Sequence, residues 1–194
     1  VPKLVFCNLD EGFGRTEPDE EIQDLLQTSV GLNLGMQFLP GAISFDPVVN
    51  FVPDIIASMI VWLDMYLTNV DRTARNTNML MWKNELWLID HGAALYFHHN
   101  RNLWQTYIQK PFPMIKSHVL LNGASKLPEA NEIICGELNA SFLESICNEL
   151  PEEWLFSRED DRNAQQVKAM YVEYLTARLQ FSANFVKEIE DARS

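Results

Sequence analysis

The segment that decides the fold is NVDRTARNTNMLMWKNELWLIDHGAAL, residues 69–95. It holds two apolar runs separated by residues 83–85, a pattern that predicts a β-hairpin with a short turn. Trp82 and Trp87 flank this turn and are expected to lie near each other across the two strands. Polar side chains occupy the loop before the hairpin and the turn after it. They are either turn formers or ligands, and the choice between these interpretations decides what the chain does.

A helix is expected directly before this segment. Between Pro53 and Asn69 the apolar residues recur at spacings of three and four, which is the period of a buried or half-buried helix. These residues are Ile56, Met59, Ile60, Leu63, Tyr66 and Leu67. The chain is therefore expected to run from a helix into a polar loop, a hairpin and a second polar turn.

The flanking sequence adds strands on one side and helices on the other. Residues 4–9 are typical of a strand, Pro18 and the acids after it mark a helix start, and GLNLGMQFLPGAISF is extended. Residues 161–191 predict one long helix with an interruption near residues 182–184. In ASFLESICNEL, one helical face carries Phe142, Leu143, Ile146, Cys147 and Leu150. The expected fold class is α+β, with helices dominating.

The composition fits one domain or one large lobe. The chain has 194 residues, of which 47% are hydrophobic, ample for a sizeable core. Its formal net charge of −12 disfavours direct nucleic-acid binding, because an acidic surface repels phosphate backbones, but it allows a nucleotide bound through a divalent cation. The longest apolar run is too short to span a bilayer and no signal peptide is visible, so no membrane association is expected.

The three cysteines, Cys7, Cys135 and Cys147, lie far apart in the sequence. Without a CxxC pair they favour neither a disulfide framework nor a zinc site. Free thiols are typical of a reducing compartment, so the expected localisation is cytoplasmic.

Three polar residues around the hairpin match a magnesium-dependent phosphotransfer site. Because a hairpin returns the chain close to its starting point, Asp90 is expected to lie near Asn76. Two oxygen ligands there suit Mg²⁺, a hard cation that prefers oxygen. Asp71, which precedes Asn76 by five positions, would keep a free carboxylate to accept a hydroxyl proton and orient the attacking oxygen. This spacing, with an Asp-X-Gly turn after the hairpin, is that of kinase active sites.

The same residues also allow simpler interpretations. The loop of residues 71–76 and the turn of residues 90–92 are rich in turn-forming and capping side chains. His91, His98 and His99 suggest a transition-metal site, and the competing interpretation is that histidines stand in a turn and at a helix end.

Four segments resemble the HipA-like kinases, specifically a bacterial branch of small HipA-like kinase domains. They are EPDEEIQDLL, GLNLGMQFLPGAISFDP, VWLDMYLTNVDRTARNTNMLMW and LWLIDHGAALYFHH. They cover the first part of the chain closely, and the helical remainder matches more loosely. The resemblance implies a protein-kinase-like fold, distantly similar to phosphoinositide kinases. Residues 1–45 would be the end of a small lobe with the hinge, and residues 46–194 a helical large lobe with the catalytic loop and metal-binding hairpin.

The resemblance implies ATP-dependent phosphoryl transfer to a serine or threonine of a protein substrate, with Mg²⁺ as the metal. On this sequence, Asp71 would be the catalytic base or hydroxyl orienter, and Asn76 and Asp90 would be the Mg²⁺ ligands. Asn78 is a rival to Asn76 as ligand. An antitoxin-like partner is also compatible with the resemblance.

Neighbouring positions follow the family pattern in part. Arg72 and Arg75 would hold the loop or a phosphate, and Arg72 follows the aspartate as in lipid kinases and HipA relatives. His91 stands where the family usually carries Phe, and Thr73 stands where relatives often carry His. These departures leave the metal ligands in place, and His91 joins the candidate site residues.

Two ATP-binding elements are not recognisable in the sequence. A kinase needs a glycine-rich loop over the phosphates and a strand lysine, whereas here Gly12 and Gly14 form a short acidic GxG and Lys3 stands at the chain start. Because the sequence opens on Val1 in a strand-like run, we expect a piece of a longer protein, nearly inactive alone, with adenine facing GMQFLPGAI. Two rival functions stay open: a small-molecule or lipid kinase using the same residues, and a non-catalytic, pseudokinase-like binding module.

Overall fold

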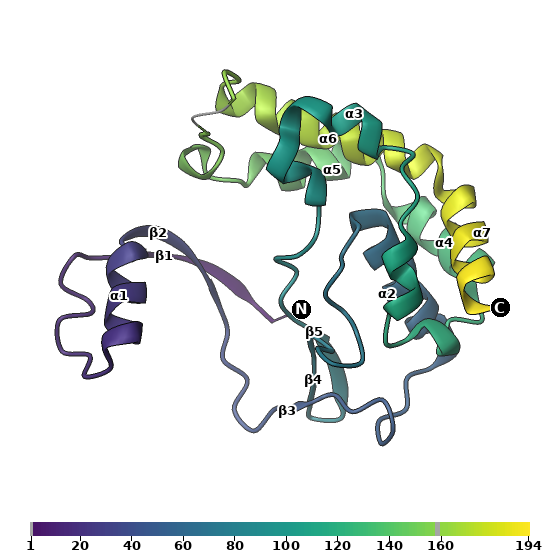
Figure 1. Ribbon diagram of the computed structural model, residues 1–194, viewed down its shortest axis with the longest axis horizontal. Coiled ribbons are helices and arrows are strands. Elements are labelled where there is room, and N and C mark those ends of the chain that lie inside the picture. The colour runs from purple at the N-terminus through teal and green to yellow at the C-terminus, as the bar shows by residue number, and fades with distance from the viewer. Residues whose placement is uncertain (1, 158–159) are drawn as a thin grey trace. The chain divides into compact units, whose positions relative to one another are not determined.

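The computed structural model describes residues 2–157 and 160–194, and Figure 1 shows its elements. It is α+β, with helices and two small antiparallel sheets among the described residues. The chain divides into two compact units. The first comprises Val1–Ser44 and Met79–Ile89, and the second comprises Phe45–Asn78 and Asp90–Ser194. The predicted α+β class is confirmed, and the assignment of kinase lobes on either side of residue 45 stays a prediction.

The first unit contains a two-stranded sheet and one helix. β1 (Leu4–Leu9) pairs antiparallel with β2 (Gly31–Met36), and α1 (Glu20–Thr28) separates them in sequence. Asp19 caps α1, because its carboxylate accepts two amide hydrogen bonds from the first turn. The helix predicted from Pro18 therefore begins two residues later, since Asp19 takes the cap position.

The predicted hairpin is part of the second sheet, with strand order β3 (Ile43–Ser44), β4 (Met79–Trp82) and β5 (Glu85–Leu88). Its turn consists of Lys83 and Asn84, which have φ angles of 51° and 64°. Two consecutive positive φ angles are the mark of a type I′ turn, whose twist matches that of the paired strands. The expected three-residue turn is too long by one, because its third residue already pairs with the end of β4.

The two tryptophans beside the turn lie against each other as predicted. The ring centroids of Trp82 and Trp87 are 5.4 Å apart and their planes meet at 79°, an edge-to-face arrangement. Nε1 of Trp82 also donates a hydrogen bond of 3.0 Å to the carbonyl of Pro40. The ammonium of Lys83 lies 4.2 Å from the centroid of Trp82. The tip of the hairpin is thus fixed by side chains as well as by the backbone.

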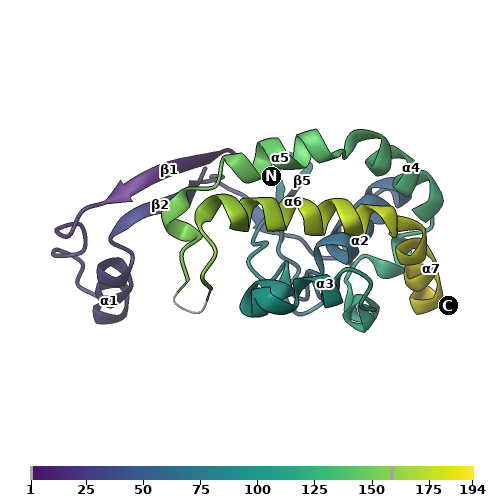
Figure 2. The ribbon, with the colours of Figure 1, turned by 90° about the horizontal axis from the view of Figure 1, so that it is seen from above.

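The second unit is a set of helices packed around α2 (Asp54–Leu67). α4 (Leu127–Glu137) and α7 (Ser182–Arg193) pack against α2, and α5 (Ala140–Asn148) packs against α6 (Ala164–Gln180). Figures 1 and 2 both show α5 and α6 running side by side. Shorter helices in the connections are η1 (Tyr96–Leu103), α3 (Trp104–Tyr107), η2 (Pro113–Ser117), η3 (Leu121–Gly123) and η4 (Glu152–Trp154).

Helix α2 supplies the centre of the core. Val61 and Trp62 are fully buried, and the ring of Trp62 stacks on that of Tyr66 with centroids 5.2 Å apart. Nε1 of Trp62 donates to the side-chain oxygen of Asn131 on α4 at 2.9 Å, so its one polar atom is satisfied. The helix predicted from the apolar periodicity is confirmed. No helix among the described residues is both long and apolar enough to cross a bilayer.

The C-terminal helical run is interrupted, as expected, but one residue earlier than the predicted break. α6 begins with a capping box formed by Asn163 and Gln166, and it ends at Gln180, with Phe181 as the cap residue before α7 starts. In α5 the predicted apolar face is only partly buried. Phe142 and Ile146 are about half exposed (48% and 49%), because α6 covers a different side of this helix.

A buried arginine joins α6 to the C-terminal end of α2. Arg178 donates hydrogen bonds to the carbonyls of Met65 and Tyr66 at 2.8 Å, and to those of Tyr107 and Ile108 at 2.9 Å. The last carbonyls of a helix lack intrahelical partners, and this guanidinium donates hydrogen bonds to two of them. Burial lowers the pKa of Arg178. The end of α2 is therefore fixed at the point where the polar loop begins.

Candidate functional site

The loop that carries Asp71 leaves α2 through a left-handed residue. Thr68 has a φ angle of 54°, and the amide of Asn69 donates back to the carbonyl of Asp64 at 2.8 Å. The side-chain oxygen of Asn69 accepts a hydrogen bond of 3.2 Å from the backbone amide of Asp71. Because Asn69 is buried, these bonds tie the backbone of Asp71 to the end of the helix.

The carboxylate of Asp71 is held by two asparagines. Its Oδ2 accepts hydrogen bonds from Nδ2 of Asn76 at 2.8 Å and from Nδ2 of Asn78 at 3.1 Å. Asn78 is buried and also donates to the carbonyl of Asp71 at 3.0 Å, whereas Asn76 is exposed. The amide of Thr73 donates to the carbonyl of Asn76 at 2.9 Å and closes the loop. The structure thus brings together Asp71 and both asparagines that the sequence offered as ligands.

Asp90 occupies a tight turn of its own. It has a φ angle of 47°, its side chain is exposed, and its Oδ1 accepts a hydrogen bond of 3.3 Å from the amide of Gly92. This turn lies beside the start of the Asp71 loop, because the amide of Val70 donates to the carbonyl of Ala93 at 3.4 Å. The hydrogen bonds of Asp90 stay within its turn and do not connect it to Asn76, so their shared role as ligands stays a prediction.

The two arginines of the loop differ in their environment. Arg75 is exposed, whereas Arg72 is buried and its Nη1 donates to the carbonyl of Asn78 at 2.6 Å. His91 is half-buried, and burial together with the positive charge of Arg72 lowers its pKa. Arg72 therefore acts within the loop, while Arg75 is free to meet solvent or a ligand.

A buried carboxylate beneath the loop was missed by the sequence interpretation. Asp64 is fully buried on α2 and accepts hydrogen bonds from Nε of Arg72 at 2.5 Å, Nδ2 of Asn69 at 2.9 Å and Nε2 of His118 at 2.9 Å. Burial acts to raise the pKa of Asp64, but the hydrogen bond from His118 and the charge of Arg72 outweigh it, so the pKa lies below its ordinary value. The available signal was an acid inside the apolar run IVWLDMYL.

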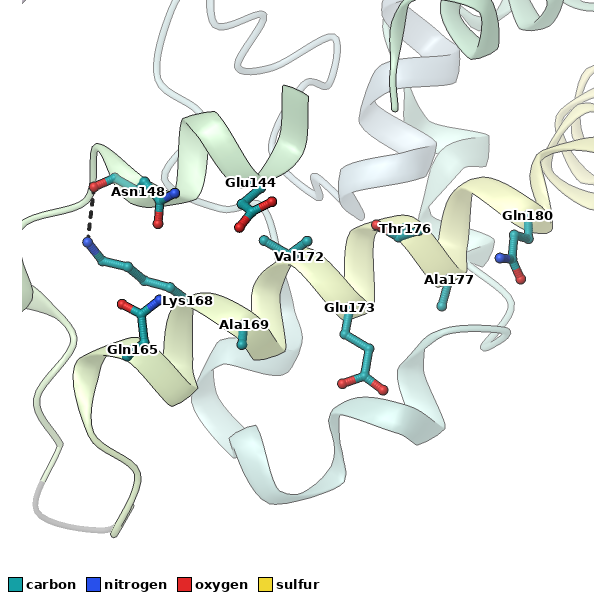
Figure 3. A pocket seen from close by; sticks show the side chains of 10 residues that line it. All are labelled: Glu144, Asn148, Gln165, Lys168, Ala169, Val172, Glu173, Thr176, Ala177 and Gln180. Atoms are coloured by element: carbon teal, nitrogen blue, oxygen red, sulfur yellow. Dashed lines mark hydrogen bonds between the residues drawn. The ribbon is translucent and has the colours of Figure 1, made fainter. Parts of the chain in front are cut away.

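A groove lies elsewhere in the second unit, between α5 and α6. Figure 3 shows its lining, which includes Glu144, Lys168, Glu173 and small side chains such as Ala169. The ammonium of Lys168 donates to the carbonyl of Asn148 at 3.0 Å and so closes the end of α5. None of the predicted site residues lines this groove, so it does not serve the Asp71 loop.

Within residues 2–157 and 160–194, no group of three or more His, Cys, Asp or Glu is arranged to hold a metal. The transition-metal interpretation of His91, His98 and His99 therefore has no support there. Burial and the nearby Arg101 lower the pKa of His98, and its ring is hydrogen-bonded to the hydroxyl of Tyr171. The expected Mg²⁺ ligands, Asn76 and Asp90, are one amide and one carboxylate. Such a pair is not a group of three His, Cys, Asp or Glu, so this finding does not test it.

Comparison with known families decides the class of the chain. The sequence matches the HipA-like kinases over residues 20–188, a span that includes α2, the Asp71 loop, the hairpin and the Asp90 turn. The chain belongs to the HipA-like kinase family. No curated protein and no solved structure matches it. As a HipA-like kinase it is a member of a family named for phosphoryl transfer, and the loop around Asp71 lies within the matched span.

Proposed function

We propose that this HipA-like kinase catalyses ATP- and Mg²⁺-dependent phosphoryl transfer to a serine or threonine of a protein substrate. The observation that carries the proposal is the pair of hydrogen bonds from Asn76 and Asn78 to one carboxylate oxygen of Asp71. Such bonds hold the carboxylate in one orientation while leaving Oδ1 without a hydrogen bond among the described residues. That oxygen is suited to accept the proton of a substrate hydroxyl.

The residues present fit a magnesium ion with its nucleotide. Asn76 and Asp90 are both exposed, and each offers a hard oxygen of the kind that Mg²⁺ prefers. Because Asn76 donates through Nδ2, its Oδ1 is the atom available to a cation. When bound, the ion would neutralise charge on the transferred phosphate. Asp71 orients the attacking hydroxyl and takes its proton, and exposed Arg75 is suited to a phosphate contact.

The proposal assigns the two ends of the chain to different parts of a kinase. Residues 46–194 would form the helical large lobe, and residues 1–45 would form the end of the small lobe with the hinge. The strands β1, β2 and β3 in the second of these segments are compatible with this assignment. Neither segment supplies a glycine-rich phosphate loop followed by a strand lysine, so the 194-residue chain alone is expected to bind ATP weakly and to transfer phosphate negligibly.

Metal binding tests the proposed ligands directly. Mn²⁺ titration of the natural gene product with an ATP analogue, followed by electron paramagnetic resonance, should give a bound signal that weakens at least about tenfold in Asn76→Ala and Asp90→Asn. Glu173→Gln, which removes an exposed carboxylate of α6, is the matched control and should bind as the wild type does. Unchanged binding in both site variants would remove Asn76 and Asp90 from the metal site.

Phosphoryl transfer is tested with the natural gene product that contains these residues. Phosphoproteome comparison after its expression should show new phosphoserine or phosphothreonine, lost in Asp71→Asn. Phosphate appearing only on small molecules or lipids would favour a kinase of another substrate class that uses the same residues. No transfer to any acceptor, with Mn²⁺ binding intact, would favour a non-catalytic binding module.

A further inference from the structure

Three buried polar side chains form a cluster beneath the Asp71 loop. Asp64, Arg72 and His118 are 0%, 1% and 7% exposed, respectively. Oδ2 of Asp64 accepts from Nε of Arg72 at 2.5 Å and from Nε2 of His118 at 2.9 Å. The cluster joins three parts of the second unit: helix α2, the Asp71 loop and the segment of residues 118–120.

The hydrogen bonds of His118 define which of its ring nitrogens carries the proton. Nδ1 accepts a hydrogen bond of 3.0 Å from the amide of Leu120, so this nitrogen carries no hydrogen. The ring is therefore neutral with its proton on Nε2, the nitrogen that donates to Asp64. With both nitrogens engaged, His118 is not available as a general base, and its part in the cluster is to orient the carboxylate.

Two routes of hydrogen bonds lead from Asp64 to Asp71. In the first, Nε of Arg72 bonds to Asp64, Nη1 of Arg72 bonds to the carbonyl of Asn78, and Nδ2 of Asn78 bonds to the carboxylate of Asp71. In the second, Asn69 donates to Asp64 and accepts from the amide of Asp71. Both the backbone and the side chain of Asp71 are thus fixed by one buried carboxylate.

A third route leads from the loop to the segment that follows η2. His118 and Thr73 form an antiparallel bridge, and the amide of Val119 donates to the carbonyl of Arg72 at 3.1 Å. The segment of residues 118–120 is therefore paired with the loop through its backbone and connected to Asp64 through His118. A shift of this segment would be transmitted to the residues on either side of Asp71.

The stability of the folded chain alone does not account for this cluster. Nη2 of Arg72 is buried without a hydrogen-bond partner among the described residues, and a buried unsatisfied donor destabilises the folded state. Buried ion pairs often contribute no more to stability than apolar side chains of the same volume. Every side-chain partner of Asp64 also lies in the loop or in the adjoining segment, rather than in the apolar core. Orientation of the loop accounts for the arrangement better than core stability does.

We propose that Asp64 and His118 are positioning residues for Asp71. Asp64 sets the orientation of the Asp71 loop, and His118 makes that orientation depend on the segment of residues 118–120. The inference rests on the proposed phosphotransferase function, because a positioned Asp71 matters only if it orients a hydroxyl.

Two substitutions of His118 separate positioning from folding. In the natural gene product, His118→Leu removes the donor to Asp64 and should lower kcat about ten- to a hundredfold while KM for ATP changes less than about twofold. His118→Gln can still donate to Asp64 and should recover most of the lost kcat. Lys116→Gln, an exposed change in η2 just before this segment, is the matched control.

Nuclear magnetic resonance of the 194-residue chain gives a readout that does not require activity. The wild type should show His118 as the neutral Nε2–H tautomer. His118→Leu should shift the side-chain amide signals of Asn78 and the backbone amide of Asp71, and His118→Gln should leave them near their wild-type positions. A proton on Nδ1 in the wild type would overturn the inference.

The outcomes also separate this inference from the proposed function. An active wild type with unchanged kcat and unchanged Asn78 signals in His118→Leu would reject the positioning role and leave the phosphotransferase assignment standing. A wild type that transfers no phosphate would reject the function, and the resonance shifts would still decide whether His118 orients the loop. If His118→Leu does not fold, the wild-type tautomer and the signals of His118→Gln decide.

Discussion

At the scale of single residues, the loop distinguishes two asparagines that look equivalent in the sequence. Asn78 is buried and donates to both the carbonyl and the carboxylate of Asp71, whereas Asn76 is exposed and donates only to the carboxylate. The buried amide is part of the framework of the loop. The exposed amide is the one that solvent, a cation or a phosphate can reach.

Alanine substitutions should separate these two roles. Asn78→Ala should lower the free energy of unfolding by about 1–3 kcal/mol, because it leaves the part-buried carbonyl of Asp71 without its side-chain donor. Asn76→Ala should change it by no more than about 0.5 kcal/mol, as expected for an exposed side chain. Urea unfolding measures both values, and equal losses in the two variants would show that Asn76 is also structural.

The buried carboxylate predicts how stability depends on acid. The pKa of Asp64 is lowered in the folded chain, so the unfolded chain binds more protons as pH falls below the unfolded value of 3.8. The stabilising contribution of Asp64 is present above that value and is lost as pH falls through the folded pKa.

Scanning calorimetry between about pH 3 and pH 6 measures this dependence. The wild type should lose stability more steeply at the acidic end than Asp64→Asn, which cannot titrate. Glu173→Gln is the control for removal of one carboxylate. Parallel curves for the wild type and Asp64→Asn would contradict the assignment of a shifted pKa to Asp64.

At the scale of elements, the end of α2 is the foundation of the site. Arg178 of α6 donates to the last carbonyls of this helix and lies 4.5 Å from the ring centroid of Phe185, and within the described part of the chain no carboxylate is among its hydrogen-bond partners. The guanidinium is therefore solvated by carbonyls and an aromatic face. The loop that begins at Thr68 therefore leaves α2 from a position that Arg178 holds in place.

Loss of this guanidinium should be costly. Arg178→Met keeps much of the side-chain length but removes the guanidinium donors to four carbonyls, two of them buried and two part-buried, and should destabilise the chain by about 3–5 kcal/mol. Arg75→Met, at an exposed arginine, should stay within about 0.5 kcal/mol of the wild type. Thermal unfolding compares the two, and a mild effect at Arg178 would show that water can replace the guanidinium.

The hairpin turn offers a change in the opposite direction. Asn84 has a φ angle of 64° at the second position of a type I′ turn, where glycine is preferred. Asn84→Gly should stabilise the hairpin by a few tenths of a kcal/mol, and Asn84→Val should destabilise it by about 1 kcal/mol or more, since a β-branched residue is strained at positive φ. Amide exchange in β4 and β5 reports both effects, and reversed signs would contradict the turn type.

Local sequence patterns were enough for much of this architecture. The period of apolar residues predicted α2, and the two apolar runs separated by residues 83–85 predicted the hairpin with its two tryptophans near each other. The spacing of the loop also brought Asp71 and Asn76 into the candidate site, and the structure joins them. The partnership of Asp64 with His118 was not predictable in this way. These residues are 54 positions apart, and no periodicity encodes a contact between a helix and a distant connecting segment.

At the scale of the whole molecule, buried apolar side chains are distributed unevenly. Among the described residues, those of the first unit are Pro2, Leu39 and Met79, and the others belong to the second unit. In β1, the side chains of Leu4, Val5 and Phe6 are each about half exposed (50%, 48% and 51%). An isolated two-stranded sheet is only marginally stable in water. Because β1 and β2 have little buried core of their own, we expect this sheet to open more easily than α2.

Hydrogen exchange should reveal this difference. Backbone amides of β1 and β2 should exchange on the order of a hundredfold faster than those of α2, because local opening costs less where few apolar contacts are lost. Mass spectrometry of peptides covering Leu4–Leu9 and Asp54–Leu67 gives the comparison. Equal protection would mean that the exposed face of β1 is covered in solution.

The contact between Trp82 and Trp87 gives the protein a built-in optical reporter. Two indoles held edge to face at 5.4 Å couple their electronic transitions, so the hairpin should contribute a paired positive and negative band to the circular dichroism spectrum. Replacing either ring with phenylalanine should abolish the pair of bands. The folded state of the hairpin can then be followed without attaching any label.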